Sequence, residues 1–221
     1  MGGIEFWDTH FSYVDIASGA EKAVGVPEQR AAGLIPADAL PPGVVFTASA
    51  DPTNGKTGIF RLEVAAVKGG SGYAVTGSGS RPVREAARTA YDYLRTHWHE
   101  LAVEKPLDGH QLNIQVVDLQ RAEALTPSSA AFAVAVVSVM LDRPVAAGTV
   151  ILGDITVGGG TLATMGLADC LQAVAEQGAR RVLIPILNAG EISSLPQEIL
   201  GKIDIGFYSD PRDAVLKALG L

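Results

Sequence analysis

The sequence predicts an α/β fold, of the α+β kind with a mixed sheet, built around one buried helix. Residues 130–141 are apolar almost all round, broken only by Ser138. This run is too short to cross a bilayer and too apolar for a surface helix, so we expect it in the core. Residues 58–67 alternate in polarity with a period of two, which predicts a strand with two different faces. Short β-branched runs then alternate with helical patterns, which indicates a mixed sheet covered by helices.

The boundaries of the central helix follow from its flanking residues. Thr126 and Pro127 are suited to the N-cap and the first helical position. Asp142-Arg143-Pro144 ends the helix. A short buried strand is then expected at Thr149–Leu152, and a strand and turn at Gly153–Gly160, whose glycines favour a hairpin.

A β-rich lead-in is expected before the main domain. Apolar residues between Phe11 and Ile16 predict a strand, residues 18–20 a turn, and residues 23–26 a return strand closed by Pro27. An irregular loop runs from there to Pro41-Pro42. We therefore divide the chain into a lead-in with a β-hairpin, residues 1–40, and a main domain, residues 41–221.

A second pair of strands is predicted at 44–50 and 58–67. The segment between them contains Gly-Lys-Thr, residues 55–57, which invites comparison with a phosphate-binding loop. That motif needs a glycine where Ala50 stands, and a helix afterwards, whereas here a strand follows. Asn54-Gly55 is a strong turn signal, so we expect a turn.

The next helix is expected to begin after Ser80, with Pro82 in its first turn. One face stays apolar for five turns, through Val83, Ala87, Ala90, Tyr91, Leu94, Trp98 and Leu101. His97 and His99 are not four residues apart, so we expect surface histidines and no zinc site.

The remaining elements alternate. Strands are expected at 73–76, 112–117, 162–165, 181–187 and 203–208, and helices at 167–175, ended by Gly178, and after Asp210 through Leu219. Cys170 lies on the apolar stripe of its helix, which indicates a buried thiol and not a nucleophile.

Composition limits the function classes. The net charge is −7, which argues against a broad phosphate-binding surface. No apolar run approaches a membrane span, and residues 1–3 lack the basic start and apolar core of an export signal. A single cysteine excludes an internal disulfide and suits a reducing cytoplasm, where we expect the protein to act.

Several segments together resemble the proteolytic domain of Lon-type (S16) serine proteases. They are Ser138 followed by RPV, and VILGDITVGGGTLATMGLADCLQAVAEQGARRVLIP, residues 150–185. A narrower resemblance, to the Lon-like C-terminal half of BrxL-type proteins of BREX phage-resistance systems, rests on FSYVDI, VPEQ, GLIP, GVVF, GIFRLEV, VILGD and SDPRDAVLKALG. It extends from about Phe6 to Leu221 and implies a Lon-type fold for the main domain.

The resemblance implies a serine nucleophile and a neutral lysine base. The family's Pro-Ser-Ala-Gly falls on residues 128–131, which makes Ser129 the candidate nucleophile, with Ser128 nearly as good. The lysine position holds Ala168, and no lysine occurs between Lys105 and Lys202. A serine without a base is a weak nucleophile.

Other nearby residues do not replace the base. Arg180 and Arg181 stay protonated, and Asp169, as the neighbour of Ala168 on a helix, faces elsewhere. Asp154 matches an acidic position of the family and is expected to hold a turn at a strand end. Helix capping remains the structural explanation for Ser128 and Ser129.

The resemblance therefore implies a degenerate protease domain that lacks peptidase activity and serves for assembly beside an AAA+ ATPase in phage defence. The alternative is an active ATP-dependent serine peptidase with an unorthodox base. The resemblance also implies a ring-shaped homo-oligomer, ATP bound only by an N-terminal ATPase half absent from this chain, and DNA contacts only through other parts. We expect no cofactor, metal or membrane contact in this chain.

Overall fold

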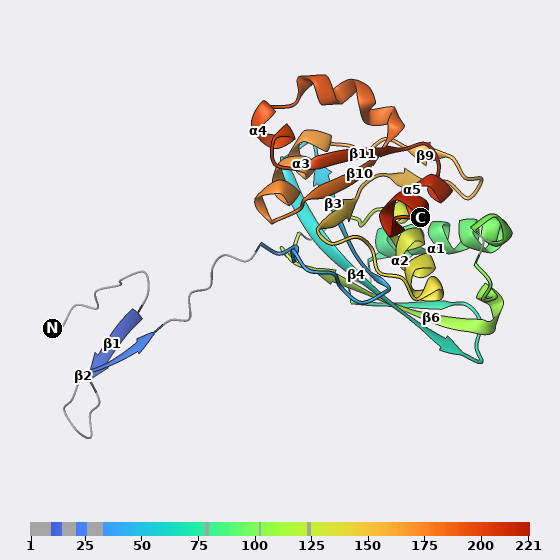
Figure 1. Ribbon diagram of the computed structural model, residues 1–221, viewed down its shortest axis with the longest axis horizontal. Helices are drawn as coiled ribbons and strands as arrows, with labels where there is room; N and C mark the ends of the chain where they lie inside the picture. Colours follow the sequence, from blue (N-terminus) through green and yellow to red (C-terminus); the bar gives the residue numbers. More distant parts are fainter. Residues whose placement is uncertain (1–9, 15–20, 26–32, 78–79, 102, 123–124) are drawn as a thin grey trace. The chain divides into compact units, whose positions relative to one another are not determined.

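A computed structural model of the 221-residue chain describes residues 10–14, 21–25, 33–77, 80–101, 103–122 and 125–221. The chain divides into two compact units, Met1–Ala32 and Gly33–Leu221 (Figure 1). Each unit is described by itself below.

The smaller unit contains an antiparallel pair of strands, β1 (His10–Val14) and β2 (Glu21–Gly25). The predicted hairpin strands are therefore confirmed. The predicted turn at 18–20, and Ile16, Val26 and Pro27, lie outside the described residues.

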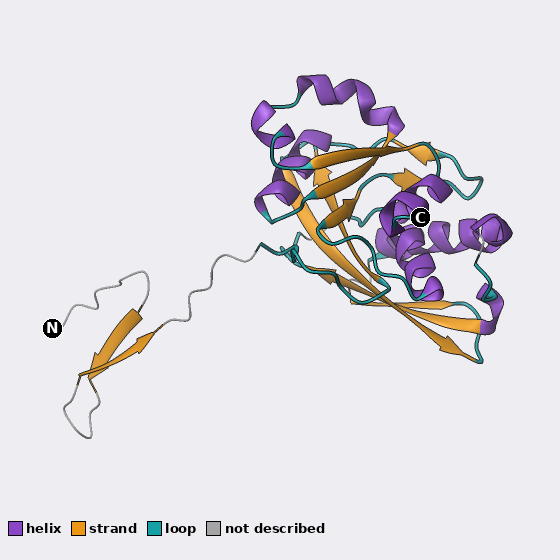
Figure 2. Cartoon of the chain, viewed as in Figure 1, coloured by secondary structure: helices purple, strands orange, loops and turns teal. Residues whose placement is uncertain are grey.

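In the described part of the larger unit, seven strands form one mixed sheet in the order β11-β10-β7-β3-β4-β6-β5 (Figure 2). They are β3 (Val44–Asp51), β4 (Lys56–Lys68), β5 (Tyr73–Gly77), β6 (His110–Asp118), β7 (Thr149–Ile151), β10 (Arg181–Pro185) and β11 (Asp204–Tyr208). The pairs β3–β4 and β4–β6 are antiparallel, and the other neighbouring strands are parallel. The predicted mixed sheet is confirmed.

Helices and short hairpin strands complete the larger unit. The α-helices are α1 (Arg81–His97), α2 (Ser129–Leu141), α3 (Leu167–Glu176), α4 (Gln197–Leu200) and α5 (Pro211–Leu219). The described residues of this unit also form the 3-10 helices η1 (Trp98–Leu101), η2 (Leu107–Gly109) and η3 (Ile186–Ser194). The strands β8 (Asp154–Ile155) and β9 (Thr161–Leu162) form a separate small hairpin.

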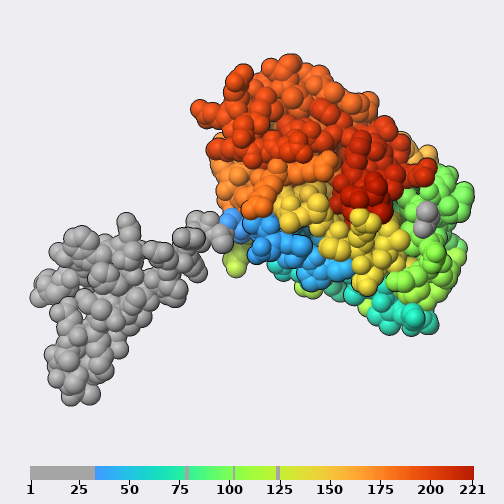
Figure 3. Space-filling view, viewed as in Figure 1, coloured from blue at the N-terminus to red at the C-terminus, as the bar shows by residue number. Residues whose placement is uncertain are grey.

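The sheet separates two hydrophobic cores, because successive side chains of a strand point to opposite faces. In β3, Val45 belongs to the core with α1, α2 and α5, whereas Phe46 belongs to the core with α3. In β7, Ile151 and Val150 divide in the same way. Helices therefore cover both faces of the sheet (Figure 1), and segments far apart in sequence lie side by side at the surface (Figure 3).

The helix α2 is the buried centre of the larger core, as its apolar sequence predicts. Eleven of its residues are buried, including Phe132 and Ser138, which are both fully buried. The Ser138 hydroxyl donates to the Arg143 carbonyl at 2.6 Å and accepts from the Gly43 N–H at 2.9 Å. These bonds satisfy the one polar side chain in the middle of the apolar run.

The structure corrects the predicted start of α2. Its N-cap is Ser128, whose hydroxyl accepts from the Ala131 N–H at 3.3 Å, and not Thr126. Pro127 therefore precedes the helix. Two adjacent serines follow the proline, and the first of them, which lies closer to the apolar run than Thr126, takes the capping position.

Other predicted boundaries shift at irregular backbone. The strand expected at 181–187 ends at Pro185 and continues as η3, and the strand expected at 162–165 is reduced to the end of β9. The apolar stripe of α1 continues into η1, where Leu101 is buried. The turn expected between the strands at 44–50 and 58–67 is confirmed, with Gly55 at a φ of 66°.

Residues 33–40, which the sequence analysis groups with the lead-in, are part of the larger unit. Ile35 is buried, and its N–H donates to the Gln177 carbonyl at 3.0 Å.

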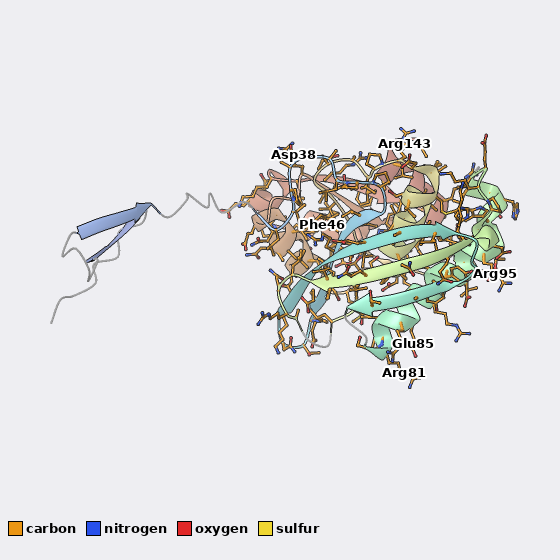
Figure 4. The ribbon with its side chains drawn as sticks, turned by 90° about the horizontal axis from the view of Figure 1, so that it is seen from below. Asp38, Phe46, Arg81, Glu85, Arg95 and Arg143 are labelled. Carbon is orange, nitrogen blue, oxygen red and sulfur yellow. The ribbon has the colours of Figure 1, made fainter. Side chains whose placement is uncertain are left out.

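At the surface of the larger unit, α1 presents exposed ion pairs such as Arg81–Glu85, at 2.8 Å (Figure 4). Within the described residues, no helix has the length and apolar character that a membrane crossing requires.

Candidate active site

A pocket of about 330 Å³ opens at the N-terminus of α2. Its walls come from β3, from the residues before α2, from the β7–β8 junction and from the segment that leads to α3. The lining residues are Ala48, Ser49, Ala50, Thr126, Ser128, Gly153, Asp154, Leu162, Ala163, Thr164 and Met165. Ser128 belongs to this set and Ser129 does not, so the two candidate serines differ in their access to the pocket.

The buried Ser128 hydroxyl is engaged by backbone on both sides. It donates to the Gly153 carbonyl and accepts from the Ala131 N–H. The first bond joins the start of α2 to the segment between β7 and β8, and the second caps the helix. Its proton is therefore directed at a carbonyl oxygen, which cannot serve as a base.

The buried Ser129 hydroxyl is held between β8 and its own helix. It donates to Asp154 Oδ1 at 2.8 Å and accepts from the Ile155 N–H at 2.9 Å. The Ser129 N–H also donates to Asp154 Oδ1, at 2.8 Å. Asp154 thus places a carboxylate at the positive end of the α2 dipole, which stabilises the helix start. The sequence analysis expects Asp154 to hold a turn at a strand end, whereas its side chain instead bonds the first residue of α2, 25 positions earlier in the chain.

The backbone between β7 and β8 is fixed by packing that only glycine allows. Gly153 has a φ of 92°, and a Cβ there would lie 2.3 Å from Pro185 Cγ and 2.5 Å from the Tyr208 hydroxyl oxygen. The Tyr208 hydroxyl donates to the Leu152 carbonyl at 2.6 Å. Burial, followed by the nearby Asp154 carboxylate, raises the pKa of Tyr208, so this donor keeps its proton.

The lysine position of the family is filled by an exposed alanine. Ala168 lies in the first turn of α3, one residue before exposed Asp169. Arg181 pairs with Asp204 across β10 and β11, at 3.4 Å. None of the described residues that line the pocket is a lysine, arginine or histidine, so the lining offers no amine or imidazole to accept the Ser128 proton.

One part of the site carries no signal in the sequence. Asn188 is fully buried in η3, where its side chain accepts from the Thr164 N–H at 2.9 Å and donates to the Thr164 carbonyl at 3.0 Å. These two bonds fix the pocket wall at Thr164. An asparagine inside a 3-10 segment follows no periodic pattern, so the sequence does not reveal the contact.

The described residues contain no group of three His, Cys, Asp or Glu arranged to hold a metal ion. Cys170 is fully buried in α3, as predicted. Burial, with a smaller effect of Asp169, raises the pKa of its thiol to about 12. This thiol is therefore unsuited to nucleophilic chemistry at neutral pH.

Residues 37–220 match the family model of the Lon protease (S16) C-terminal proteolytic domain. The chain is 37% identical to the Lon-like protease BrxL of Escherichia coli O9:H4 (strain HS) over 222 residues, covering 100% of this chain and 32% of the relative. It is 33% identical to the Lon-like protease BrxL of Bacillus cereus (strain H3081.97) over 222 residues, covering 100% of this chain and 33% of the relative.

A more distant match is the Lon protease 1 of Thermus thermophilus, 30% identical over 162 residues, or 73% of this chain and 20% of the relative. The chain spans about a third of the length of the BrxL relatives. The family match, the mixed sheet with a buried central helix and the serine pair at its start lead to one conclusion: the chain belongs to the Lon (S16) C-terminal proteolytic domain family.

Proposed function

We propose that this chain is a degenerate Lon-type domain that lacks peptidase activity and serves as an assembly module of an AAA+ ATPase in phage defence. The observation that carries the first part is the bonding of the two serine hydroxyls. One donates to a backbone carbonyl and the other to the Asp154 carboxylate.

The chemistry of amide attack explains why this arrangement is inactive. The serine hydroxyl must lose its proton as it attacks, and in the family a neutral lysine amine accepts it. Ala168 offers no such group, and the Gly153 carbonyl has no useful basicity. Of the two serines, Ser128 lines the pocket, so we take it as the remnant of the nucleophile; the bonds of Ser129 suit a structural role.

The assembly role is supported by the resemblance to BrxL-type proteins over the whole chain. Since this chain spans about a third of those relatives, the ATPase would lie in the remaining part, where ATP would bind and DNA would be contacted. The Lon-type domain would then supply subunit contacts in a closed ring. The net charge of −7 agrees with a chain that does not itself bind DNA.

One contact favours an alternative, an active peptidase with an unorthodox base. The Ser129 hydroxyl and Asp154 Oδ1 are 2.8 Å apart, within reach for proton transfer. Against it, Ser129 is 3% exposed and also accepts from the Ile155 N–H, so its oxygen is poorly placed to attack a substrate.

Hydrolysis of unfolded casein and of short fluorogenic peptides tests the two functions. We expect the wild-type chain to give the same background rate as the Ser128→Ala and Ser129→Ala variants. We also expect Ala168→Lys to stay inactive, because the Ser128 proton remains directed at Gly153 and no glycine flanks the serine. Turnover by the wild type that either serine variant abolishes would overturn the proposal and identify the nucleophile.

A further inference from the structure

The pocket beside α2 carries a net negative charge. Asp154 is the one charged residue among those that line it, and the others are small, hydroxylated or apolar. The side chain of Asp154 is exposed, so its charge is accessible from solvent. A group that enters the pocket therefore meets a carboxylate with no competing cation in the lining.

Half of that carboxylate is available to an incoming donor. Both hydrogen bonds that Asp154 accepts, from the Ser129 N–H and hydroxyl, go to Oδ1. In the described part of the chain, Oδ2 accepts from no protein donor. The contacts at Oδ1 fix the orientation of the group, so Oδ2 is held in place for a ligand and loses little entropy when it binds.

The pocket also has an open strand edge. The edge of β3 that faces β7 pairs with it only at Phe46–Val150, and Ala48, Ser49 and Ala50 then line the pocket. Residues 162–165 also line the pocket, and Asn188 bonds the backbone of Thr164. An extended main chain can add along such an edge, with side chains entering the space on alternate positions.

The volume limits what can enter. About 330 Å³ is at the small end of the range for ligand sites, enough for one long side chain and its adjoining backbone. The small side chains of Ala48, Ala50 and Ala163 leave room for an aliphatic stem. A lysine or arginine side chain fits this combination, with its stem against apolar wall and its cationic end at Asp154.

We infer that this pocket binds a cationic group of an extended peptide, read by Asp154, and holds it without cleaving it. The inference rests on the proposed function, because it assigns a binding role to a site that has lost its base. The same ammonium chemistry is offered by a lysine side chain and by a peptide amino terminus, so the experiment separates the two.

Binding is measured by fluorescence polarisation with labelled, acetylated and amidated alanine pentapeptides that differ at the central residue. We expect the lysine peptide to bind about tenfold more tightly than the norleucine peptide, which has nearly the same shape without the charge. A third peptide, with a free amino terminus and a central norleucine, reports on capture of the amino group. Asp154→Asn should remove the preference for charge, since an amide keeps an acceptor for Ser129 and loses the charge.

Two controls keep the test decisive. Ala163→Phe narrows the pocket while leaving Asp154 in the sequence, and it should weaken the binding of all three peptides. The comparison of the lysine and norleucine peptides uses the wild-type chain, so it does not depend on the folding of any variant. Equal binding of the lysine and norleucine peptides, no binding of either, or an unchanged preference in Asp154→Asn would overturn the inference. Mass spectrometry of the recovered peptides reports cleavage separately, and cleaved products would refute the proposed function. In that case the ratio of the affinities for the lysine and norleucine peptides would still decide the charge preference.

Discussion

Ser128 and Ser129 are adjacent, yet their hydroxyls bond in different directions. Ser128 is directed at the Gly153 carbonyl and lines the pocket, and Ser129 is enclosed by Asp154 and Ile155. Ser128 is the N-cap residue, with non-helical backbone, and Ser129 is the first residue of α2, so their side chains have different surroundings. The sequence leaves both serines open as candidates, because the motif around them lacks the glycines that would fix the register.

The structure raises the expected cost of removing the Ser129 hydroxyl. As a possible helix cap alone, Ser129→Ala should change the free energy of unfolding by less than about 1 kcal/mol. Here the change leaves the buried Ile155 N–H without an acceptor, so we expect a loss of about 1–3 kcal/mol. Urea unfolding measures it, with Ser193→Ala, an exposed serine, as the matched control. Equal small effects of both variants would mean that the bonds to Asp154 and Ile155 contribute little.

The raised pKa of the Cys170 thiol predicts that the protein loses stability at alkaline pH. In the folded chain its pKa is raised to about 12 from an ordinary value of 9.0. Between these values the unfolded thiol loses its proton while the folded thiol keeps it, so the free energy of unfolding falls as pH rises above about 9. Unfolding at pH 8 and pH 10 should show this fall, and a smaller one for Cys170→Ala. The remainder comes from buried tyrosines such as Tyr93, whose pKa is raised to about 12. If the free energy of unfolding falls equally between pH 8 and pH 10 in the wild type and in Cys170→Ala, the thiol is excluded as a cause.

At the scale of elements, α2 contributes more buried residues to the larger core than any other element. It packs against α1, α5, β3 and β4, and its apolar residues surround the whole helix. Two polar groups interrupt this surface, and each is satisfied: Ser138 by Arg143 and Gly43, and the helix start by Asp154. The helix therefore fixes the Ser128–Ser129 pair to the sheet.

Phe132 tests the burial of α2 directly. It is fully buried, so Phe132→Ala should lower the free energy of unfolding by about 3–5 kcal/mol, from lost apolar contact and the cavity that remains. Met165→Ala is the matched control, because Met165 is 70% exposed and its loss should change stability by less than about 0.5 kcal/mol. Chemical denaturation compares them. A Phe132 effect as small as that of Met165 would contradict the packing of α2.

The elements differ in how far the sequence predicts them, and the reason is periodicity. The strand at β4 and the helix α1 follow clear periods of two and 3.6, and both are confirmed. The segment 186–194 begins with apolar Ile-Leu, which extends the preceding strand pattern, but the backbone turns into η3. A 3-10 helix has no amphipathic signature of its own, so η3 and the four-residue α4 are not predictable from pattern alone.

For the site, the residue types are predictable and the contacts are not. The absence of a lysine between 105 and 202 is a property of the sequence. The Ser128–Gly153 and Ser129–Asp154 bonds join residues 25 positions apart, and no local pattern specifies them. The pocket wall at Thr164 depends likewise on Asn188, 24 positions away.

At the scale of the whole molecule, the proposed assembly role predicts self-association. Sedimentation velocity of the chain over a wide concentration range should show reversible association, with a weight-average mass that rises with concentration. A closed ring of more than two subunits is built from heterologous contacts, so on the proposed role larger species should not stop at a dimer. A strictly monomeric chain, together with unchanged assembly of a longer BrxL-type protein that lacks this domain, would contradict the scaffold role.

The central claim is that no group activates the serine of the pocket. A fluorophosphonate probe tests it directly, because an activated serine oxygen attacks the phosphorus and displaces fluoride, whereas an unactivated hydroxyl reacts slowly. We predict that the wild-type chain is labelled no more than Ser128→Ala and Ser129→Ala under conditions that fully label an active serine hydrolase. Labelling of the wild type near one probe per chain, located by mass spectrometry at Ser128 or Ser129 and lost in the matching variant, would contradict the account.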